Sequence, residues 1–111
     1  MKNNYYITTP IYYPSAKPHM GHAYSSIVAD FFARFKKING FKVYFLTGTD
    51  EHGQKIEKAS IDAEMDTLEF CNKLSKTFKD LSLKLNLSNN DFIRTTEKRH
   101  KLSVEKLCKI L

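Results

Sequence analysis

The stretch PHMGH, residues 18–22, lies between an apolar segment, YYITT (residues 5–9), and a segment of helical periodicity that contains VADFF (residues 28–32). The first segment predicts a strand, and three prolines mark a loop after it. A strand, a loop and a helix start in this order are typical of the ligand-binding edge of an open α/β sheet. Backbone N–H groups and the positive end of the helix dipole at such a start favour phosphate.

Two histidines, His19 and His22, stand three positions apart at this helix start, so that both rings can face one site. A short motif of this kind also occurs by chance, and a single histidine is more often a surface or core residue. A second polar loop favours a functional role, because the predicted strand FKVYFL (residues 41–46) ends in TGTDEHG (residues 47–53). In a parallel sheet the two loops emerge at the same edge.

The helix predicted over residues 21–39 carries an apolar and mostly aromatic stripe. This aromatic stripe consists of Tyr24, Ile27, Val28, Phe31, Phe32, Phe35 and Ile38. We expect the stripe to form the core, and Asn39-Gly40 to end the helix with a left-handed glycine. The strand over residues 5–9 lacks clean alternation, which predicts a central place in the sheet.

The remaining elements follow from the same periodicity. A short polar helix is predicted over residues 53–63. Asp66 and Glu69 have the spacing of a capping box, which starts a longer helix running to Leu85. Residues 92–94 predict a short strand, and Thr96 is expected to cap a last helix that runs to the final residue.

Three motifs in register resemble the amino terminus of the methionyl-tRNA synthetases, a family of class I aminoacyl-tRNA synthetases. They are TTPIYY (residues 8–13), PHMGHAY (residues 18–24) and FLTGTDEHG (residues 45–53). The resemblance continues through DFIRTT (residues 91–96) and covers essentially the whole chain. HMGH matches the HIGH signature of the class, with Met20 in place of the usual Ile or Leu. The resemblance implies an α/β fold with a Rossmann-type parallel sheet (the HUP class), of which residues 1–111 form the amino-terminal part only.

The same resemblance implies that the full enzyme activates L-methionine with ATP to methionyl-adenylate and then transfers it to tRNA. His19 and His22 are then the catalytic residues, which stabilise charge on the phosphate oxygens. His19, Gly21 and His22 bind ATP, which is expected to arrive with Mg²⁺. Gly21 has no side chain, so that the adenine can lie against the backbone.

The family pattern also assigns the methionine site. Ile11 and Tyr13 match positions that line the methionine pocket, and Asp50 matches the residue that holds the methionine ammonium group. Two structural alternatives stay open. The apolar segment 11–13 also fits a lid over the core, and Asp50 also fits a turn or N-cap aspartate.

The departures from the family are as informative as the matches. The chain has no lysine-rich KMSKS-type loop, and it lacks the cysteine-bearing connective insertion, the rest of the sheet and the helical anticodon-binding domain. We therefore expect one of two cases. Either these residues are the amino-terminal piece of a longer synthetase, whose remaining chain is their partner, or they are the product of a truncated gene. The 111-residue chain alone is expected to be marginally stable and to charge no tRNA.

Two other functions remain possible from the sequence. A small nucleotidyltransferase of the related H-x-G-H superfamily would suit the chain length better, but it has no need of the loop at residues 47–53. A non-catalytic nucleotide- or RNA-binding fragment is the other alternative. A continuation of the gene with a KMSKS-type loop would favour the synthetase.

Composition narrows the class further. The 18 lysines and arginines against 12 acidic residues give a net charge of +6, which suits an anionic partner and also an ordinary protein surface. A hydrophobic content of 41% excludes a wholly disordered chain. Cys71 and Cys108 form no C-x-x-C pair and His52 has no partner at ligand spacing, so no metal site, zinc included, is expected from this segment.

Location is predicted from two features of the chain. Residues 1–6 lack the apolar segment of a signal peptide, and no apolar run approaches the length that spans a membrane. Both cysteines are expected to be buried as small apolar residues in a reducing compartment. The sequence therefore predicts a cytoplasmic protein without membrane contact.

Overall fold

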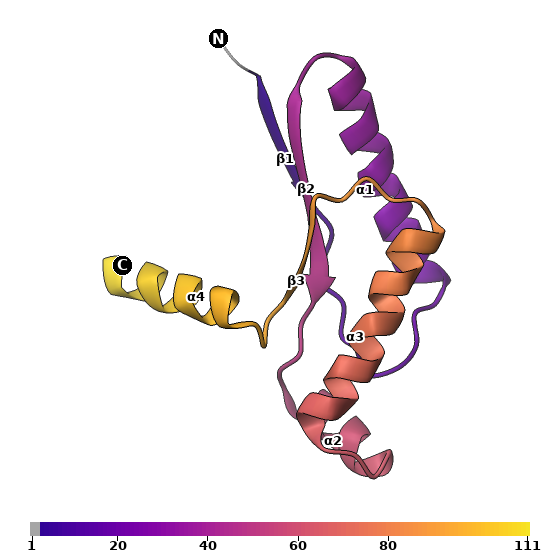
Figure 1. The fold of residues 1–111 in the computed structure, drawn as a ribbon, viewed down its shortest axis with the longest axis vertical. Helices are drawn as coiled ribbons and strands as arrows, with labels where there is room; N and C mark the ends of the chain where they lie inside the picture. The colour runs from indigo at the N-terminus through magenta and orange to yellow at the C-terminus, as the bar shows by residue number, and fades with distance from the viewer. Residues whose placement is uncertain (1–2) are drawn as a thin grey trace.

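A computed structural model describes residues 3–111 as a parallel sheet with helices on both sides (Figure 1). The strands are β1 (Asn4–Thr8), β2 (Lys42–Thr49) and β3 (Asp91–Arg94), in the spatial order β1-β2-β3. Both strand pairs are parallel. The loops that follow β1 and β2 therefore leave the sheet at one edge, as the sequence predicted. The part of the signal-peptide prediction that rests on Met1 and Lys2 lies outside the described residues.

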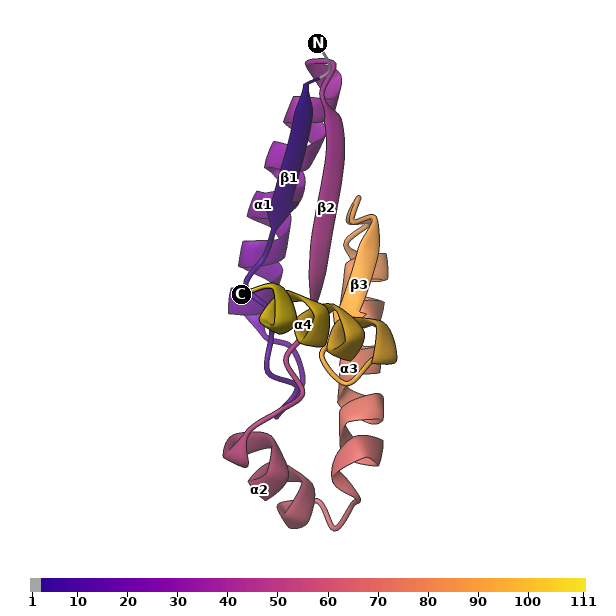
Figure 2. The ribbon, with the colours of Figure 1, turned by 90° about the vertical axis from the view of Figure 1, so that its left-hand side faces the viewer.

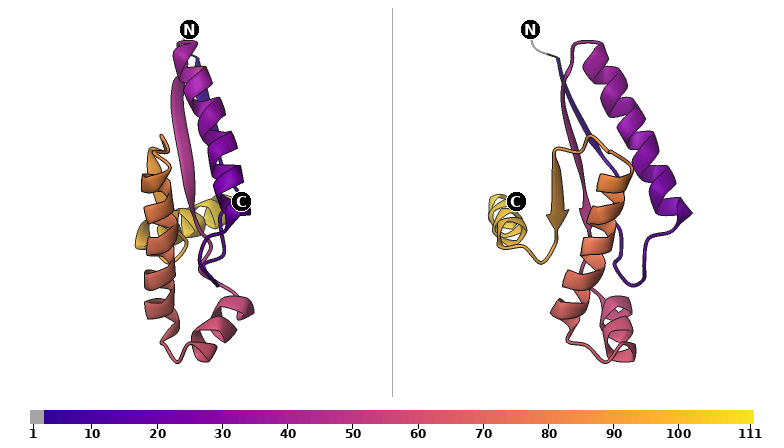
Figure 3. Two further views of the ribbon diagram at one scale, coloured as in Figure 1. Left: turned by 90° about the vertical axis from the view of Figure 1, so that its right-hand side faces the viewer. Right: turned by 45° about the vertical axis from the view of Figure 1, so that its right-hand side comes forward.

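The helices form two layers. They are α1 (Met20–Ile38), α2 (Gln54–Asp62), α3 (Thr67–Lys84) and α4 (Lys98–Ile110). Helices α1 and α3 cover one face of the sheet, and α4 lies on the opposite side (Figures 1 and 2). Figure 3 shows that α4 projects away from the layer formed by α1 and α3. No side chain of α4 is buried among the residues that the structure describes.

The face of α1 that meets the sheet is made of small side chains. Its buried residues are Ser26, Ala29 and Ala33. They recur at intervals of three and four residues, so that they share one side of the helix. Ala29 and Ala33 pack with the fully buried Phe45 of β2. Small side chains let the helix axis approach the strands closely, which large rings on this side would prevent.

The aromatic stripe of α1 points away from the sheet, so the prediction that it forms the core was wrong. The side chains of Phe31 and Phe35 are 62% and 50% exposed, and their rings stack with centroids 6.4 Å apart. The helix has an apolar face of large residues and an opposite face of small ones. Periodicity identifies both faces but does not show which of them packs on the strands.

Strand β1 lies at an edge of the described sheet, and β2 holds the central place. The prediction that residues 5–9 are central was therefore wrong for this part of the chain. The side chains of β1 alternate between exposed and half-buried. Tyr6 is exposed beside Tyr44 of β2, with ring centroids 6.0 Å apart.

The core is divided into small clusters, and the molecule exposes more surface than a compact protein of the same mass. Three clusters of buried apolar side chains are present among residues 3–111. The accessible surface is 7946 Å², against about 6,300 Å² for a compact protein of this mass. The radius of gyration is 15.7 Å, against about 13 Å for a compact domain of this length. Much apolar surface of the described chain is therefore left uncovered.

The helix ends were predicted with mixed success. Asp66 caps α3 through bonds from the N–H groups of Leu68 and Glu69, and Gly40 follows α1 with φ at 84°, both as predicted. Within residues 3–111, the Glu69 side chain does not return the bond that would complete the predicted capping box. The N-cap of α4 is Glu97 and not Thr96. The hydroxyl group of Thr96 is instead directed at the buried carboxylate of Glu51, to which it donates at 3.0 Å.

The cysteines and the hydropathy of the helices complete the description. Cys71 is buried as predicted, where burial and the neighbouring Glu51 raise the pKa of its thiol to about 11. Cys108 is exposed, contrary to the prediction, because α4 buries no residue against the part of the chain that the structure describes. Over residues 3–111, no helix combines the length and the apolar character needed to cross a membrane.

Candidate active site

The loop after β1 is joined by its backbone to the end of β2. The N–H of Tyr12 donates to the carbonyl of Gly48 at 3.0 Å, and the N–H of Asp50 donates to the carbonyl of Tyr12 at 2.9 Å. These two bonds continue the parallel pairing beyond the strand ends. They place Ile11 and Tyr13, which flank Tyr12, beside the loop that carries Asp50.

Tyr12 fixes this loop to the helices. Its ring is buried against Phe78 of α3 and His22 of α1, with centroids 5.7 and 4.9 Å away. Its hydroxyl group shares a hydrogen bond of 2.8 Å with the hydroxyl of Ser26. Because alternate side chains point in opposite directions, Ile11 and Tyr13 face outward and are exposed.

The histidine loop, residues 18–22, is held by the histidines themselves. The N–H of Gly21 donates to Nδ1 of His19 at 3.0 Å, and the N–H of His19 donates to Nδ1 of His22 at 3.1 Å. The two rings stack with centroids 3.9 Å apart. Since both Nδ1 atoms accept a hydrogen bond, each neutral ring carries its proton on Nε2. The helix start thus offers two N–H donors from side chains.

Gly21 is required by the position of the His19 ring. A Cβ atom at residue 21 would lie 2.9 Å from Cε1 and 3.1 Å from Nδ1 of that ring. Without a side chain at this position, the ring can fold over the first turn of α1. The pKa of His22 is lowered below its usual value, mainly by burial and to a lesser extent by repulsion from a charged His19. The neutral form of the ring is therefore favoured.

A cleft of about 360 Å³ opens beside the two histidines. Its lining consists of Ile11, Tyr12, Tyr13, Ser15, Ala16, Lys17, His19, His22 and Lys55. This volume is within the range of small-molecule sites in proteins. The structure thus brings together four of the six predicted site residues, and neither Gly21 nor Asp50 is among the lining residues.

Two lysines of this cleft were not predicted as site residues. Lys17 was expected to be a solvated loop charge, and Lys55, in the first turn of α2, was given no role. Their ammonium groups add positive charge to a cleft that already holds two histidine donors. The signal in the sequence is their place, one just before the histidine loop and the other just after residues 47–53.

The acidic loop, residues 47–53, is anchored by a buried carboxylate that the sequence analysis missed. The side chain of Glu51 is fully buried and accepts from Nε and Nη2 of Arg94, both at 2.7 Å. The hydroxyl groups of Thr49 and Thr96 donate to the same carboxylate at 2.7 and 3.0 Å. The carboxylate raises the pKa of Arg94 further above its usual value.

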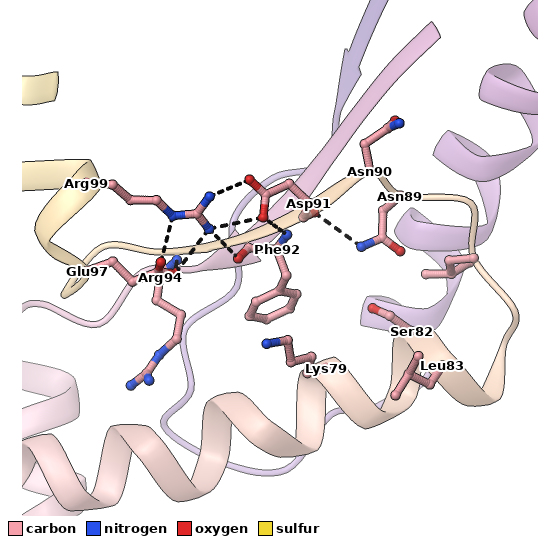
Figure 4. Close-up of a pocket in the computed structure, with 11 residues that line it drawn as sticks. Lys79, Ser82, Leu83, Asn89, Asn90, Asp91, Phe92, Arg94, Glu97 and Arg99 are labelled. Carbon is pink, nitrogen blue, oxygen red and sulfur yellow. Dashed lines mark hydrogen bonds and ion pairs between the residues drawn. The ribbon is translucent and has the colours of Figure 1, made fainter.

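A larger cavity, of about 580 Å³, lies between α3 and β3 (Figure 4). Its acidic groups are already paired, because Arg99 binds both Asp91 and Glu97 and lowers the pKa of each carboxyl group. Figure 4 shows Arg94 pointing away from Arg99, toward α3. None of the predicted site residues lines this cavity, so its size alone does not make it the active site. Within residues 3–111, no group of three or more His, Cys, Asp or Glu side chains is arranged to hold a metal ion.

Comparison with known proteins identifies the family. The family model described as tRNA synthetases class I (M) matches residues 5–111. The methionine–tRNA ligase of Rickettsia felis is 58% identical over 104 residues, and that of Listeria monocytogenes is 52% identical over 106 residues. These alignments cover 94% and 96% of this chain, but only 20% and 16% of the relatives. The chain thus spans about a fifth of the length of its relatives.

The solved structures agree with the sequence comparison. Mycobacterium tuberculosis methionyl-tRNA synthetase in complex with methionyl-adenylate superposes with a TM-score of 0.93 at 43% identity. The match covers 98% of this chain and 21% of that one. A second structure of that enzyme, bound by methionyl-adenylate, gives a TM-score of 0.84. The predicted Rossmann-type α/β fold is thereby confirmed as the amino-terminal part of a catalytic domain, and the chain belongs to the class I tRNA synthetases, in the methionyl branch.

Proposed function

We propose that residues 1–111 supply the ATP-binding half and part of the methionine pocket of a methionine–tRNA ligase. The observation that carries the proposal is the cleft in which two Nε2–H donors, on His19 and His22, adjoin the outward side chains of Ile11 and Tyr13. Methionine–tRNA ligases align over almost the whole chain, and two solved structures of one relative hold methionyl-adenylate.

The histidines act on the phosphate in this proposal. The methionine carboxylate attacks the α-phosphate of ATP in line, the bond to the β-phosphate oxygen breaks, and pyrophosphate leaves. The protein contributes by positioning and by stabilising negative charge on the phosphate oxygens. His19 and His22 donate to those oxygens from Nε2, and the ammonium groups of Lys17 and Lys55 add charge to the same cleft.

Methionine is recognised by shape and by charge. Ile11 and Tyr13 form an apolar wall for the thioether side chain, and discrimination by packing is worth about 1–3 kcal/mol per methylene. Asp50 binds the ammonium group of the amino acid. Its carboxylate is half-buried and accepts a single long bond within the described chain, from the N–H of His52 at 3.4 Å. It is therefore available to a cation.

The remaining partners follow from the reaction. Mg²⁺ enters with ATP, on the phosphate groups of the substrate. We propose no zinc site from this segment, because Cys71 is buried in α3 whereas Cys108 is exposed on α4. The other partners are tRNA and the rest of the synthetase chain, and the expected compartment is the cytoplasm. The small nucleotidyltransferase is not favoured, since the family match includes residues 47–53.

Methionine-dependent exchange of pyrophosphate into ATP tests this proposal. The enzyme to use is a complete synthetase that carries residues 1–111 as its amino-terminal segment. We expect exchange with L-methionine, and much weaker exchange with 2-aminobutyrate, which keeps the ammonium and carboxylate groups but lacks the thioether. Equal exchange with both amino acids, or no exchange with methionine, would contradict the proposal.

A further inference from the structure

We infer that Glu51 and Arg94 are positioning residues for the amino-acid substrate: their buried ion pair holds the acidic loop so that Asp50 meets the methionine ammonium group. The inference rests on the proposed function, because it takes Asp50 as the group that binds methionine. Neither residue lines the cleft beside the histidines, so neither is expected to touch ATP.

The geometry of the pair is that of a rigid anchor. Arg94 presents Nε and Nη2 to the two carboxylate oxygens of Glu51, and each bond measures 2.7 Å. Such two-point contacts fix the orientation of both groups as well as their distance. The second hydrogen of Nη2 donates to the side-chain oxygen of Asn72 on α3 at 2.6 Å. Arg94 thus ties the acidic loop to β3 and α3 together.

The backbone around Asp50 is fixed from two directions. On one side, the N–H of Asp50 donates to the carbonyl of Tyr12 at 2.9 Å. On the other side, the N–H of Glu51 donates to the hydroxyl of Thr95 at 2.8 Å. Thr95 is the residue directly after Arg94, so the ion pair and this bond support one another. The carboxylate of Asp50 is left as the weakly bonded group of a tightly held loop.

Stability alone is a poor reason for such a pair. Removing a carboxylate and a guanidinium from water is costly, and apolar replacements of similar volume are often neutral or stabilising. Breaking the pair by removing one partner, in contrast, leaves an uncompensated buried charge. A substitution of both partners therefore separates the two roles: it relieves the buried charge, but it also removes the two-point anchor of the loop.

The test uses the complete synthetase with four variants: Glu51→Gln, Arg94→Met, Arg94→Lys and the double variant Glu51→Gln/Arg94→Met. Each single neutral variant is expected to raise the KM for methionine on the order of tenfold, less than removal of the Asp50 charge itself would, while the KM for ATP stays unchanged. Arg94→Lys keeps the positive charge but cannot make the two-point contact with the carboxylate, so it should give an intermediate KM for methionine. The double variant should regain the thermal stability that the single variants lose. Its KM for methionine should nevertheless stay raised, as in the single variants.

The matched control is the exposed ion pair of Lys76 and Asp80 on α3, whose Nζ and Oδ2 atoms are 3.2 Å apart. Lys76→Met/Asp80→Asn should change neither KM. If the four variants raise the KM for both substrates equally, or if the double variant regains methionine affinity together with stability, the pair serves stability only and the inference is wrong.

Hydrogen exchange gives a readout that does not depend on activity. Arg94→Met should speed the exchange of the backbone N–H groups of Asp50 and Glu51, and the control pair should not. Unchanged exchange would overturn the inference even if the enzyme is active. If the unsubstituted synthetase does not exchange pyrophosphate into ATP when methionine is present, the proposed function is overturned instead. The hydrogen-exchange rates of the N–H groups still decide whether the pair holds the loop.

Discussion

The two loops of the candidate site are held in opposite ways. In the histidine loop the bonds join residues two or three positions apart, and the rings are exposed or half-exposed. In the acidic loop the anchor joins Glu51 to Arg94, which is 43 positions away, and the carboxylate is fully buried. The first arrangement leaves donor atoms free for a ligand. The second uses the carboxylate of Glu51 to fix the backbone and leaves only that of Asp50 weakly bonded, so different effects are expected when the two loops are altered.

The largest expected effect lies in the histidine loop. In the complete synthetase, His19→Ala or His22→Ala should lower the rate of methionine-dependent exchange by about 10²–10³-fold, the usual loss for one donor to a developing charge. The methionine dissociation constant should stay unchanged, because neither ring faces the amino acid in the proposal. His100→Ala, on α4, is the control. Wild-type rates in both variants would remove the catalytic role.

Gly21→Ala is a graded companion to these variants. It keeps both rings but places a methyl group 2.9 Å from Cε1 of His19. Because the His19 ring is exposed, it can move aside from the methyl group while the His22 ring stays, so we expect a smaller loss of rate than for the alanine variants of the histidines. A loss as large as theirs would indicate that the backbone of the turn, and not the rings, carries the effect.

The next effect in size concerns the acidic loop. Asp50→Ala should weaken methionine binding by about 2–3 kcal/mol, the low end for loss of a charged partner, because the carboxylate is only half-buried. ATP binding should be unaffected. Equilibrium dialysis with labelled methionine measures the change, with Asp80→Asn as the exposed control. An unchanged dissociation constant would make Asp50 a turn residue only.

The smallest effect is a change in titration. The pKa of His22 is lowered by burial and by the neighbouring His19, so it should fall below its usual value near 6.5. The unfolded chain then binds more protons than the folded one in this range. The free energy of unfolding therefore increases as the pH rises toward 6.5, and this contribution is lost as the pH falls below the lowered pKa of His22.

NMR of histidine-labelled enzyme checks this directly. The His22 signals, assigned by their loss in His22→Ala, should titrate below pH 6.5, and His19→Asn should move the midpoint upward because a neighbouring charge is removed. A midpoint at or above 6.5 in the unsubstituted enzyme would contradict the proposed environment of the ring.

The sequence predicted what depends on short distances along the chain. The order of strands and helices and the cap at Asp66 were correct, since periodicity and capping residues are local signals. The meeting of the two loops was also correct, and it follows from the general geometry of parallel sheets. Ile11, Tyr13, His19 and His22, which all belong to the segment from the end of β1 to the first turn of α1, line one cleft. The roles of these residues stay predictions.

The errors concern contacts between distant residues. Thr96 has the right residue type for an N-cap, but its hydroxyl is used by Glu51, 45 positions earlier. The aromatic stripe has the right period for a core, but the small residues of the opposite face meet the strands. Nothing in the local pattern of Arg94 indicates its partner. Such choices are made by the packing of whole elements, which a pattern along one segment does not describe.

The exposed aromatic stripe of α1 also has a consequence during synthesis. A ribosome adds about 5–20 residues per second, and the aligned 104 residues make up 20% of the Rickettsia felis ligase. In a chain of that length, about 480 residues follow the stripe, so it is made roughly 25–100 s before the last residue. During this time only the segments already synthesised can cover the rings, and Arg34 and Lys37 are the exposed cations beside them.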